Sequence, residues 1–437
     1  MNIKIMNKKK LSFIMIGIVS NCLFALNAQA ANHFVRQGAT GSANGNDWTN
    51  AYTSLPATLV RGDTYYIGAG SYSGRDFNTA ASGTTVITIK KAIESDHGTN
   101  TGWQSSYGTG QAIFAGSGVS FSSNYWVFDG TVGSGSNPNA YGFYFTPPNS
   151  GSSIRPVVYN GSYVQIRHAA VTCPGPSNDI QQFGFSGTGN SVTTDYTYVN
   201  NCQVSYWNQG SNNVISNSYL GTYWSSTANH GVHVEQIDNP SFFNNIVTSC
   251  DIQCIEPGGG STTNISNGKY YNNVFVNVKG SNGVLKGVSS GAIKDTVIYG
   301  NTFINVAGPI LYQNNAGLGS GSGNVIVNNV LYNSPTLYEQ AGGGAISHSY
   351  NAFFSSGTIS ETGVQIGSGD PFVSYATGDY RLKAATQSGL ALPSPYNLDI
   401  NGDARGANGV WDRGAYELAG GSLQIQPPLN LLVTFTP

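Results

Sequence analysis

Short apolar alternations recur along this chain at a regular interval, and residues typical of turns separate them. The clearest copies are "NNVISNSYLGT", "SFFNNIVTSC", "KYYNNVFVNV", "TVIYGNTFINV" and "NVIVNNVLYNS". Each copy has an asparagine 28 residues after the previous one, with an apolar or aromatic residue three positions before it and two positions after it. Strand-length alternations at a fixed period, without an apolar stripe long enough for a helix, predict a β-solenoid. The five asparagines are Asn217, Asn245, Asn273, Asn301 and Asn329.

In a β-solenoid each repeat forms one coil, whose strands pair with the coils above and below at a spacing of about 4.8 Å. Asparagine suits the turns, because it tolerates the left-handed backbone conformation and its amide can hydrogen-bond to the next coil. We therefore expect the five asparagines to stack in one column and the flanking apolar residues to fill the interior.

Less regular coils extend toward the N-terminus through "SNYWVFDGTV", "GSYVQIRHAAV" and "YTYVNNCQVSYW". The aromatic pairs Tyr206–Trp207 and Tyr223–Trp224 are 17 residues apart, which indicates either a shortened coil or two strands of one coil. The stretch "GSGSNPNAYGFYFTPPNSGSS" predicts a loop that leaves the solenoid.

Composition is typical of an all-β protein with many turns. Charged residues make up only 9% of the chain, whereas it contains 57 glycines and 12% aromatic residues. Low charge alone is also found in disordered chains, but this aromatic content and the regular apolar positions favour a folded protein.

The first 30 residues have the features of a secretory signal peptide. Lys8, Lys9 and Lys10 precede the apolar run "LSFIMIGIVSNCLFAL", and the small residues "AQA" end at Ala30. The run is too short and wrongly flanked for a membrane span, and no other segment could cross a membrane. We expect a soluble, secreted protein in the extracellular space or at the cell surface, with the periplasm as an alternative.

The net charge of the chain limits which classes of ligand it can bind. The leader carries four lysines and no acid, so the remaining chain has 15 basic and 21 acidic residues. A mildly acidic chain without a basic run is a poor nucleic-acid binder, and it binds a polyanionic glycan only with a local basic groove or a bound cation. Nothing in the sequence indicates oligomerisation, and we expect a monomer.

Four cysteines remain after the leader: Cys173, Cys202, Cys250 and Cys254. The pair in "CDIQC" could bind a metal or act in redox chemistry, but it lacks a second Cys/His pair at zinc spacing. Burial in the core is the favoured interpretation, and the sequence leaves the disulfide state open.

Together these features resemble the secreted bacterial right-handed parallel β-helix repeat proteins of the pectin-lyase-like superfamily. The opening "HFVRQGATGSANGNDWTNAYTSLPATLVRGDTYYIGAGSYSG" is similar to the N-terminal entry of such proteins: a strand, a loop, a short capping helix and "GDTYYIGAGSY". The end, "DYRLKAATQSGLALPSPYNLDINGDARGANGVWDRGAYEL", is similar to their C-terminal closing segment.

The resemblance and the repeat predict an all-β, right-handed parallel β-helix with five regions. These are a signal peptide at 1–30, an N-terminal cap and first coil at 31–80, the β-helix at 81–360 with its 28-residue coils clearest at 214–334, a C-terminal closing segment at 361–418, and a tail or linker at 419–437.

Many members of the superfamily are polysaccharide lyases, others are glycoside hydrolases, and many have no assigned activity. A hydrolase needs clustered aspartates, and no Asp-Asp pair lies between residues 130 and 340. A lyase needs a cation or basic group on the uronate, a base for the adjacent proton, and an acid for the leaving oxygen.

The nearest equivalent surrounds "NHGVHVEQID", where His230, His233 and Glu235 precede Glu256 on the next coil and Lys279 and Lys286 on the one after. We predict His233 or Lys286 as the catalytic base. Glu235 and Glu256 are expected either to bind a cation, for which calcium is the candidate, or to steer the substrate. The alternative is the ordinary outer face of one coil, and zinc binding by the histidines is less favoured because no third histidine is near.

Aromatic residues beside turns suit the stacking of sugar rings. We predict saccharide contacts for Tyr206, Trp207, Tyr223, Trp224 and Tyr312, with packing under loops as the alternative. Neither His168 nor "DINGD", Asp399 to Asp403, is assigned a function, because a turn explains both.

The sequence leaves open whether the protein is an enzyme. The expected function is β-elimination on an extracellular or cell-surface polysaccharide. The alternative is a non-catalytic surface, adhesion or carbohydrate-binding solenoid.

Overall fold

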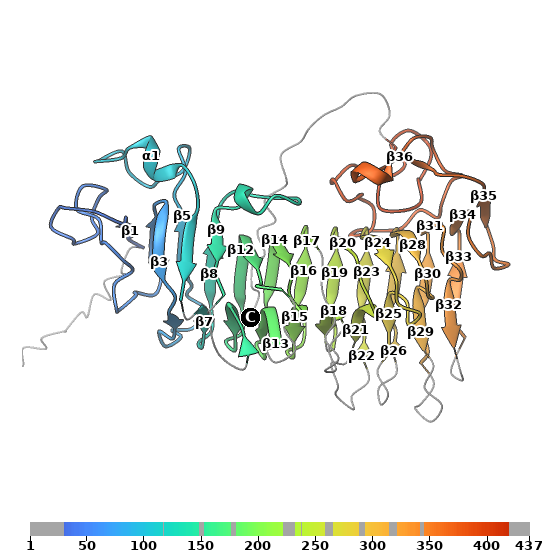
Figure 1. The fold of residues 1–437 in the computed structure, drawn as a ribbon, viewed down its shortest axis with the longest axis horizontal. Helices are drawn as coiled ribbons and strands as arrows, with labels where there is room; N and C mark the ends of the chain where they lie inside the picture. The colour runs from blue at the N-terminus through green and yellow to red at the C-terminus, as the bar shows by residue number, and fades with distance from the viewer. Residues whose placement is uncertain are drawn as a thin grey trace, which may run out of the picture.

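A computed structural model describes residues 30–116, 118–147, 153–175, 181–221, 232–236, 238–257, 265–287, 293–313, 321–340 and 345–418. The signal-peptide interpretation of the N-terminus and the predicted tail at 419–437 fall on residues outside these ranges, apart from Ala30. The described chain is a long coil of short strands that stack side by side (Figure 1).

The strands form three ladders, which we call the first, second and third faces. The first face contains β1 (Asn32–Val35), β2 (Thr64–Ile67), β5 (Ile87–Lys91), β8 (Trp126–Asp129), β12 (Val164–Thr172), β14 (Thr193–Asn200), β16 (Val214–Ser216), β19 (Ser241–Phe243), β23 (Lys269–Tyr271), β27 (Val297–Tyr299), β30 (Val325–Val327) and β33 (Ser347–Ser349).

The second face shares the long strands β12 and β14. It also contains β3 (Gly70–Ser73), β6 (Ala112–Ala115), β9 (Phe143–Phe145), β17 (Tyr219–Leu220), β20 (Ile246–Thr248), β24 (Val274–Val278), β28 (Thr302–Val306), β31 (Val330–Tyr332), β34 (Ala352–Phe354) and β35 (Gln365–Gly367).

The third face is a separate 11-stranded sheet. It contains β4 (Asp76–Phe77), β7 (Val119–Phe121), β10 (Ser153–Ile154), β11 (Val157–Tyr159), β13 (Gln181–Gly187), β15 (Val204–Asn208), β18 (Val232–Gln236), β21 (Gln253–Pro257), β25 (Leu285–Lys286), β29 (Leu311–Gln313) and β32 (Tyr338–Gln340).

Small elements complete the described chain: the pair β22 (Ile265–Ser266) and β26 (Ile293–Lys294), the hairpin β36 (Phe372–Ser374) and β37 (Asp379–Leu382), the helix α1 (Ser105–Gly108), and the 3-10 turns η1 (Pro138–Ala140) and η2 (Tyr375–Thr377). All ladder pairings are parallel, which confirms the predicted all-β parallel β-helix. None of the helices in the described ranges is both long and apolar enough to span a membrane.

Coil length varies more than the sequence repeat indicates. The step from β14 to β16 takes 21 residues and the step from β16 to β19 takes 27. The next three steps take 28 residues each, and the step from β30 to β33 takes 22. The shortened step precedes Tyr206, whose own ladder partner Val234 follows 28 residues later, so both interpretations of the spacing between the two aromatic pairs stay predictions. Tyr223 and Trp224 themselves lie outside the described residues.

The predicted asparagine column exists, with one correction. Asn245, Asn273, Asn301 and Asn329 are fully buried, and each side-chain amide donates to the next Oδ1 along the column, at 2.9–3.1 Å, with Asn351 last. Because the preceding coil is one residue shorter, Ser218 rather than Asn217 occupies this column below Asn245.

The predicted left-handed conformation belongs to the residue before the column. Asn217, Asn244, Asn272 and Asn328 have φ between 50° and 60°, and Gly300 occupies this place in the coil where asparagine is missing. Asn244 donates to the Oδ1 of Asn217 at 3.1 Å, so this neighbouring column holds its own amide contacts.

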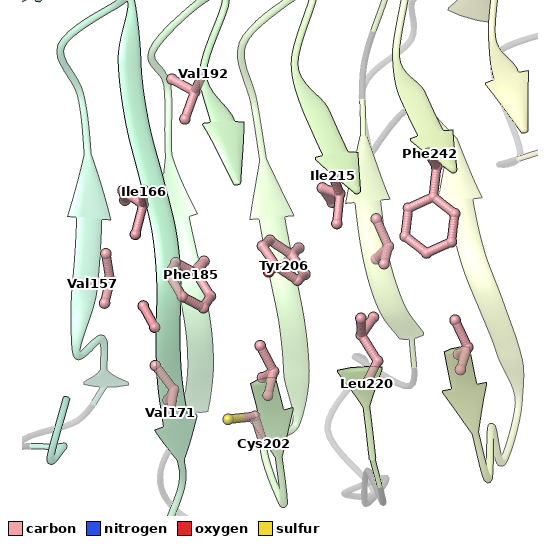
Figure 2. Packing of buried hydrophobic residues seen from close by; sticks show 14 of the residues in the cluster. Val157, Ile166, Val171, Phe185, Val192, Cys202, Tyr206, Ile215, Leu220 and Phe242 are labelled. Carbon is pink, nitrogen blue, oxygen red and sulfur yellow. The ribbon is translucent and has the colours of Figure 1, made fainter. Parts of the chain in front are cut away.

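Apolar side chains from all three faces meet in the interior. Figure 2 shows Ile166, Ile215 and Phe242 of the first face lying across from Phe185 and Tyr206 of the third face. Phe185 and Tyr206 stack with centroids 5.0 Å apart, which continues the coil repeat as an aromatic stack. The core is therefore one cluster that extends along the helix axis.

All four described cysteines form disulfides inside this core. Cys173 pairs with Cys202, and Cys250 pairs with Cys254. The core interpretation of "CDIQC" is confirmed, because both of its cysteines are fully buried and bonded to each other.

The ends of the β-helix differ from the resemblance in two details. No helix lies between β1 and β2, where a capping helix was expected, and Phe34, Trp48 and Tyr66 instead pack as a separate aromatic cluster. At the other end β35 adds a last rung, and the chain then folds back along the side of the coils (Figure 1). Most of the C-terminal segment thus covers a lateral surface instead of the open end.

Candidate functional site

The outward positions of the third face form one column of polar and aromatic residues. Ile255, Leu285 and Leu311 are fully buried, so the alternation of a strand turns their neighbours Glu256, Lys286 and Tyr312 outward. The register pairs Trp207 with Glu235, Glu235 with Glu256, Lys286 with Tyr312, and Tyr312 with Glu339, and the pairing of Ile255 with Leu285 places Lys286 beside Glu256. We call Trp207, Glu235, Glu256, Lys286, Tyr312 and Glu339 the third-face column.

The structure therefore brings several predicted residues into one register. The backbone positions of Glu235 and Lys286 are two rungs apart, or about 10 Å, which a single oligosaccharide can bridge. The side chains of Glu256, Lys286 and Tyr312 are half-buried. Their catalytic, metal-binding and saccharide-binding roles remain predictions.

Glu256 is oriented by a short chain of hydrogen bonds. Gln253 donates from Nε2 to Glu256 Oε2 at 2.7 Å, and Asn282 donates to Gln253 Oε1 at 3.1 Å. These amide contacts fix the carboxylate without neutralising its charge. Neither amide was singled out from the sequence, because the coil brings the three residues together.

The backbone of His233, the alternative predicted base, lies outside the third-face column. It lies between Val232 and Val234, whose partners are Gln253 and Ile255, so its ladder position is beside buried Cys254 and not in the third-face column. The side chains of His233 and Glu235 are outside the described set, as is all of His230.

One predicted saccharide contact is wrong. Tyr206 is fully buried in the core, where its hydroxyl hydrogen-bonds to Thr197 Oγ1, so its ring cannot meet a sugar. Burial raises the pKa of Tyr206 to about 12, which keeps this hydroxyl neutral. Sequence reasoning failed here because adjacent residues of a strand point to opposite sides, and only Trp207 of the pair points outward.

Trp207 is half-buried against Phe183, with ring centroids 5.5 Å apart. The guanidinium of Arg155 lies 4.7 Å from the centre of the same indole. Trp207 thus combines an aromatic surface with a neighbouring positive charge at one end of the third-face column.

The predicted metal ligands are two carboxylates of the column, Glu235 and Glu256. Among the residues that the structure describes, no three His, Cys, Asp or Glu side chains gather as a metal site. Glu256, with Glu235 at the adjacent ladder position, offers the hard oxygen donors that calcium prefers, but a complete calcium shell needs six to eight oxygens. Substrate and water would have to supply the rest.

A second set of charges, which the sequence reasoning did not single out, lies on the first face. Arg167 lies between Asp129 and Asp195 on the adjacent coils, with N–O distances of 3.8 and 3.4 Å. Asp195 also accepts hydrogen bonds from Ser216 Oγ at 2.8 Å and Asn217 Nδ2 at 2.7 Å. These charged groups satisfy one another, so their role is structural. The 28-residue spacing of Arg167 and Asp195 in the sequence could have predicted that the two side chains lie on adjacent coils.

His168 and "DINGD" have structural roles, in agreement with the turn interpretation. His168 has φ of 51°, stacks on Tyr196 with centroids 4.9 Å apart, and places Nδ1 2.9 Å from the carbonyl oxygen of Gly133. Asp399 accepts backbone N–H bonds from Asn401 and Asp403 of its own turn.

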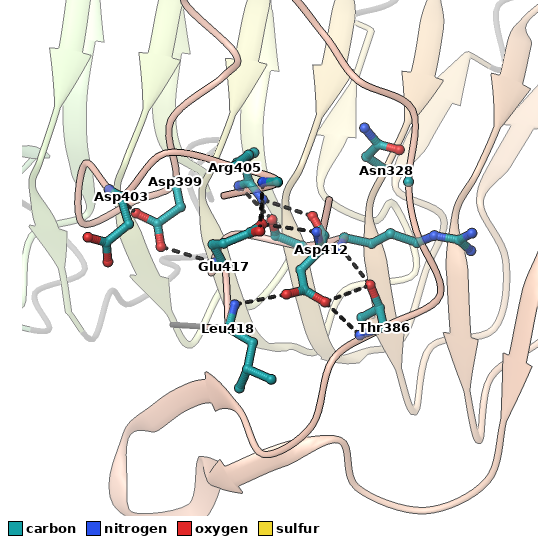
Figure 3. A network of polar contacts seen from close by, with 12 residues as sticks. Asn328, Thr386, Asp399, Asp403, Arg405, Asp412, Glu417 and Leu418 are labelled. Carbon is teal, nitrogen blue, oxygen red and sulfur yellow. Dashed lines mark hydrogen bonds and ion pairs between the residues drawn. The ribbon is translucent and has the colours of Figure 1, made fainter. Parts of the chain in front are cut away.

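A buried polar network fastens the C-terminal segment to the coils (Figure 3). Arg405 donates from Nη2 to Asn272 Oδ1 at 2.9 Å and to the carbonyl of Gly414 at 2.8 Å. Burial raises the pKa of the Asp399 and Glu417 carboxyls and lowers the pKa of the Arg405 guanidinium. The network joins the segment to the left-handed asparagine column.

Comparisons with known proteins bear only on the architecture. No family model matches the chain, and no curated protein matches it. Among solved structures, it is similar to XylC in complex with xylose, with a TM-score of 0.46 and 8% identity over 78% of this chain and 86% of that chain.

It is also similar to a PL6 family polysaccharide lyase from Pseudopedobacter saltans, with a TM-score of 0.36 and 13% identity over 78% of this chain and 95% of that chain. For the PL6 family alginate lyase AlyGC the TM-score is 0.33 and the identity 13%, over 82% of this chain and 57% of that chain. At these identities the chemistry of the site must be inferred from the residues of this chain.

Proposed function

We propose that the protein is a secreted, carbohydrate-active β-helix that cleaves an acidic polysaccharide by β-elimination along the third-face column. The observation that carries the proposal is the register of Glu235, Glu256, Lys286 and Tyr312 on consecutive rungs. A saccharide chain parallel to the helix axis would meet these residues in order, and the predicted leader would deliver the protein to such a substrate.

Each residue would have one task in this reaction. The amine of Lys286 takes the proton from the carbon beside the uronate carboxylate, the electron pair of that C–H bond forms the new double bond, and the glycosidic C–O bond breaks while its oxygen takes a proton from solvent water. Tyr312, on the next rung, contacts the sugar ring. Glu235 and Glu256 would hold a calcium ion, whose chemistry is to neutralise the uronate.

The test is a panel of acidic polysaccharides, with and without calcium, followed by the absorbance of the unsaturated product. We expect wild-type protein to form product and Lys286→Ala to lose about a hundredfold or more in rate, because general bases contribute that much. Lys279→Ala is the matched control, because Lys279 lies on the same coil, is 69% exposed and forms an ion pair with Asp251 at 3.2 Å. Its activity should match that of the wild type.

The continuous ladders favour a second candidate, a rigid surface or adhesion solenoid that binds glycan without cleaving it. Retention of the protein on immobilised glycan, together with no product from any polysaccharide, would support this candidate and exclude the lyase. Equal activity of Lys286→Ala and wild type would instead show that the chemistry lies elsewhere.

A further inference from the structure

Several arginines in the structure lie over aromatic rings and also bond to backbone carbonyls. Arg61 lies 4.8 Å from the centre of the Trp126 ring, and its terminal nitrogens donate to the carbonyls of Thr79 and Tyr125. Arg75 lies 5.3 Å from the Phe77 ring and donates to Pro56 and Ala57. Such arginines have a structural task, because ring and carbonyls together satisfy the guanidinium. Arg36 and Arg413 follow the same pattern.

Arg155 is the exception. Its guanidinium lies between two rings, 4.5 Å from the centre of Phe183 and 4.7 Å from that of Trp207, and Nε donates to Ser153 Oγ at 3.1 Å. Within the part of the chain that the structure describes, its two terminal nitrogens have no hydrogen-bond partner. The guanidinium of Arg155 is thus half-buried, charged and held in one orientation, while the N–H groups of its two terminal nitrogens remain available to a ligand.

The position of Arg155 relates it to the candidate site. Trp207, over which it lies, is the first member of the third-face column, and Lys286 is three rungs further along. Three rungs correspond to about 14 Å between the backbones of Trp207 and Lys286. This is the separation expected for a contact to a different sugar unit of the same chain, not to the unit that reacts.

We propose that Arg155, held by Phe183 and Trp207, is a carboxylate-binding subsite for a uronate unit of the saccharide that occupies the third-face column. The inference rests on the proposed function and adds a residue that selects the substrate. A planar guanidinium with two unused terminal nitrogens matches a carboxylate in bidentate geometry, and the flanking rings limit its motion and its contact with water. In a chain with few cations, such a group distinguishes acidic from neutral glycans.

The experiment measures binding of uronate tetrasaccharides, prepared from polygalacturonate and from alginate, and of their carboxyl-reduced forms. Calorimetry in the Lys286→Ala background prevents turnover. Arg155→Met keeps the aliphatic contact with the rings, and should weaken binding of at least one uronate tetrasaccharide about tenfold to a hundredfold, because charge-assisted hydrogen bonds are lost. Binding of the reduced forms should not change.

Two variants serve as controls. Arg155→Lys keeps the charge without the planar fork and should give an intermediate loss. Arg75→Met removes an arginine that also precedes a strand of the third face and covers a phenylalanine, but whose nitrogens are bonded to carbonyls. It should leave the affinity for uronates unchanged.

The outcomes separate this inference from the proposed function. Product formation by the wild type, with unchanged affinity and KM in Arg155→Met, would overturn the subsite and leave the lyase intact. Uronate-selective binding that depends on Arg155, without any product, would support the subsite and overturn the lyase. Equal affinity of the wild type for acidic and reduced forms, or no binding of either, would overturn the subsite.

Discussion

The two asparagines of the "NN" pair in a 28-residue coil differ in backbone conformation. Asn272 has φ of 55° and turns the chain, while Asn273 stays in the ordinary region and points into the buried amide column. The side chain of Asn273 donates to Phe242 O at 2.8 Å and accepts from the backbone N–H of Asn245 at 3.0 Å. One residue solves the steric problem of the turn, and the other satisfies polar groups that the turn buries.

Replacement of Asn273 by alanine should therefore destabilise the protein by about 2–4 kcal/mol, because buried backbone groups lose their partners. The midpoint of urea unfolding measures the effect. Asn305→Gly is the control, because Asn305 stacks amides in a half-exposed column and has φ of 54°, which glycine also adopts. The assigned roles would be contradicted if the free energy of unfolding changed by more than about 0.5 kcal/mol in Asn305→Gly, or did not change in Asn273→Ala.

At the scale of elements, a buried lysine joins β5 to α1. Lys91 is fully buried, and its Nζ donates to the carbonyls of Ala92 at 2.6 Å, Tyr107 at 3.4 Å and Gly108 at 3.2 Å. The last two belong to the end of α1, which is too short to be stable alone. Burial lowers the pKa of Lys91 from 10.5 to about 8.

This shift predicts a pH dependence of stability. Between pH 8 and 10.5 the folded Lys91 binds fewer protons than the unfolded one, so stability rises with pH across this window. Below pH 8 the burial of the charged lysine lowers the free energy of unfolding by its full amount. Deprotonation at higher pH raises that free energy again, by at most about 3 kcal/mol. Unfolding midpoints at pH 7 to 10.5 should show this rise relative to Lys91→Met.

Lys90→Met provides the control for Lys91, because Lys90 is the preceding residue of β5 and forms a partly exposed ion pair with Asp96. This variant should keep the pH dependence of the wild type in that window. If Lys91→Met had the same dependence as the wild type, the rise would have to come from other groups.

At the scale of the whole molecule, the C-terminal segment covers part of the β-helix that would otherwise expose apolar residues. Val274, Ile304 and Val330 on the second face are fully buried in a cluster with Tyr380 and Ala415 of the segment. The described contacts of the segment are with the first and second faces, and the third-face column lies on another side of the coil. The segment thus stabilises one surface while function is expected on another.

Removal of the buried charge of Arg405 should release the C-terminal segment from the coils. Arg405→Met leaves the carboxyls of Asp399, Asp412 and Glu417 without their cation, at a cost of about 3–5 kcal/mol. In limited proteolysis of this variant, the C-terminal segment should be cleaved earlier than the coils. Arg381→Met is the control, because Arg381 is 54% exposed and forms a surface ion pair with Asp379. Cleavage of the coils first, or equal rates in both variants, would contradict this fastening role.

The sequence by itself determined the architecture, because a solenoid repeats the same local requirements in every coil. The apolar alternation and the 28-residue step predict the strands, the ladders and the column of Asn245, Asn273, Asn301 and Asn329 without long-range information. The error at Asn217 has the same origin, because a coil shortened by one residue moves the asparagine into the neighbouring column.

Only the tertiary structure decided which side chains share a surface. Adjacent Tyr206 and Trp207 are equivalent candidates in the sequence, but the strand buries Tyr206 in the core and turns the half-buried Trp207 outward. Arg155 lies 52 positions before Trp207 in the chain, with irregular coils between them, so no repeat predicts their contact. Side-chain direction and contacts across coils of unequal length depend on register, and register is fixed only when the coils pack together.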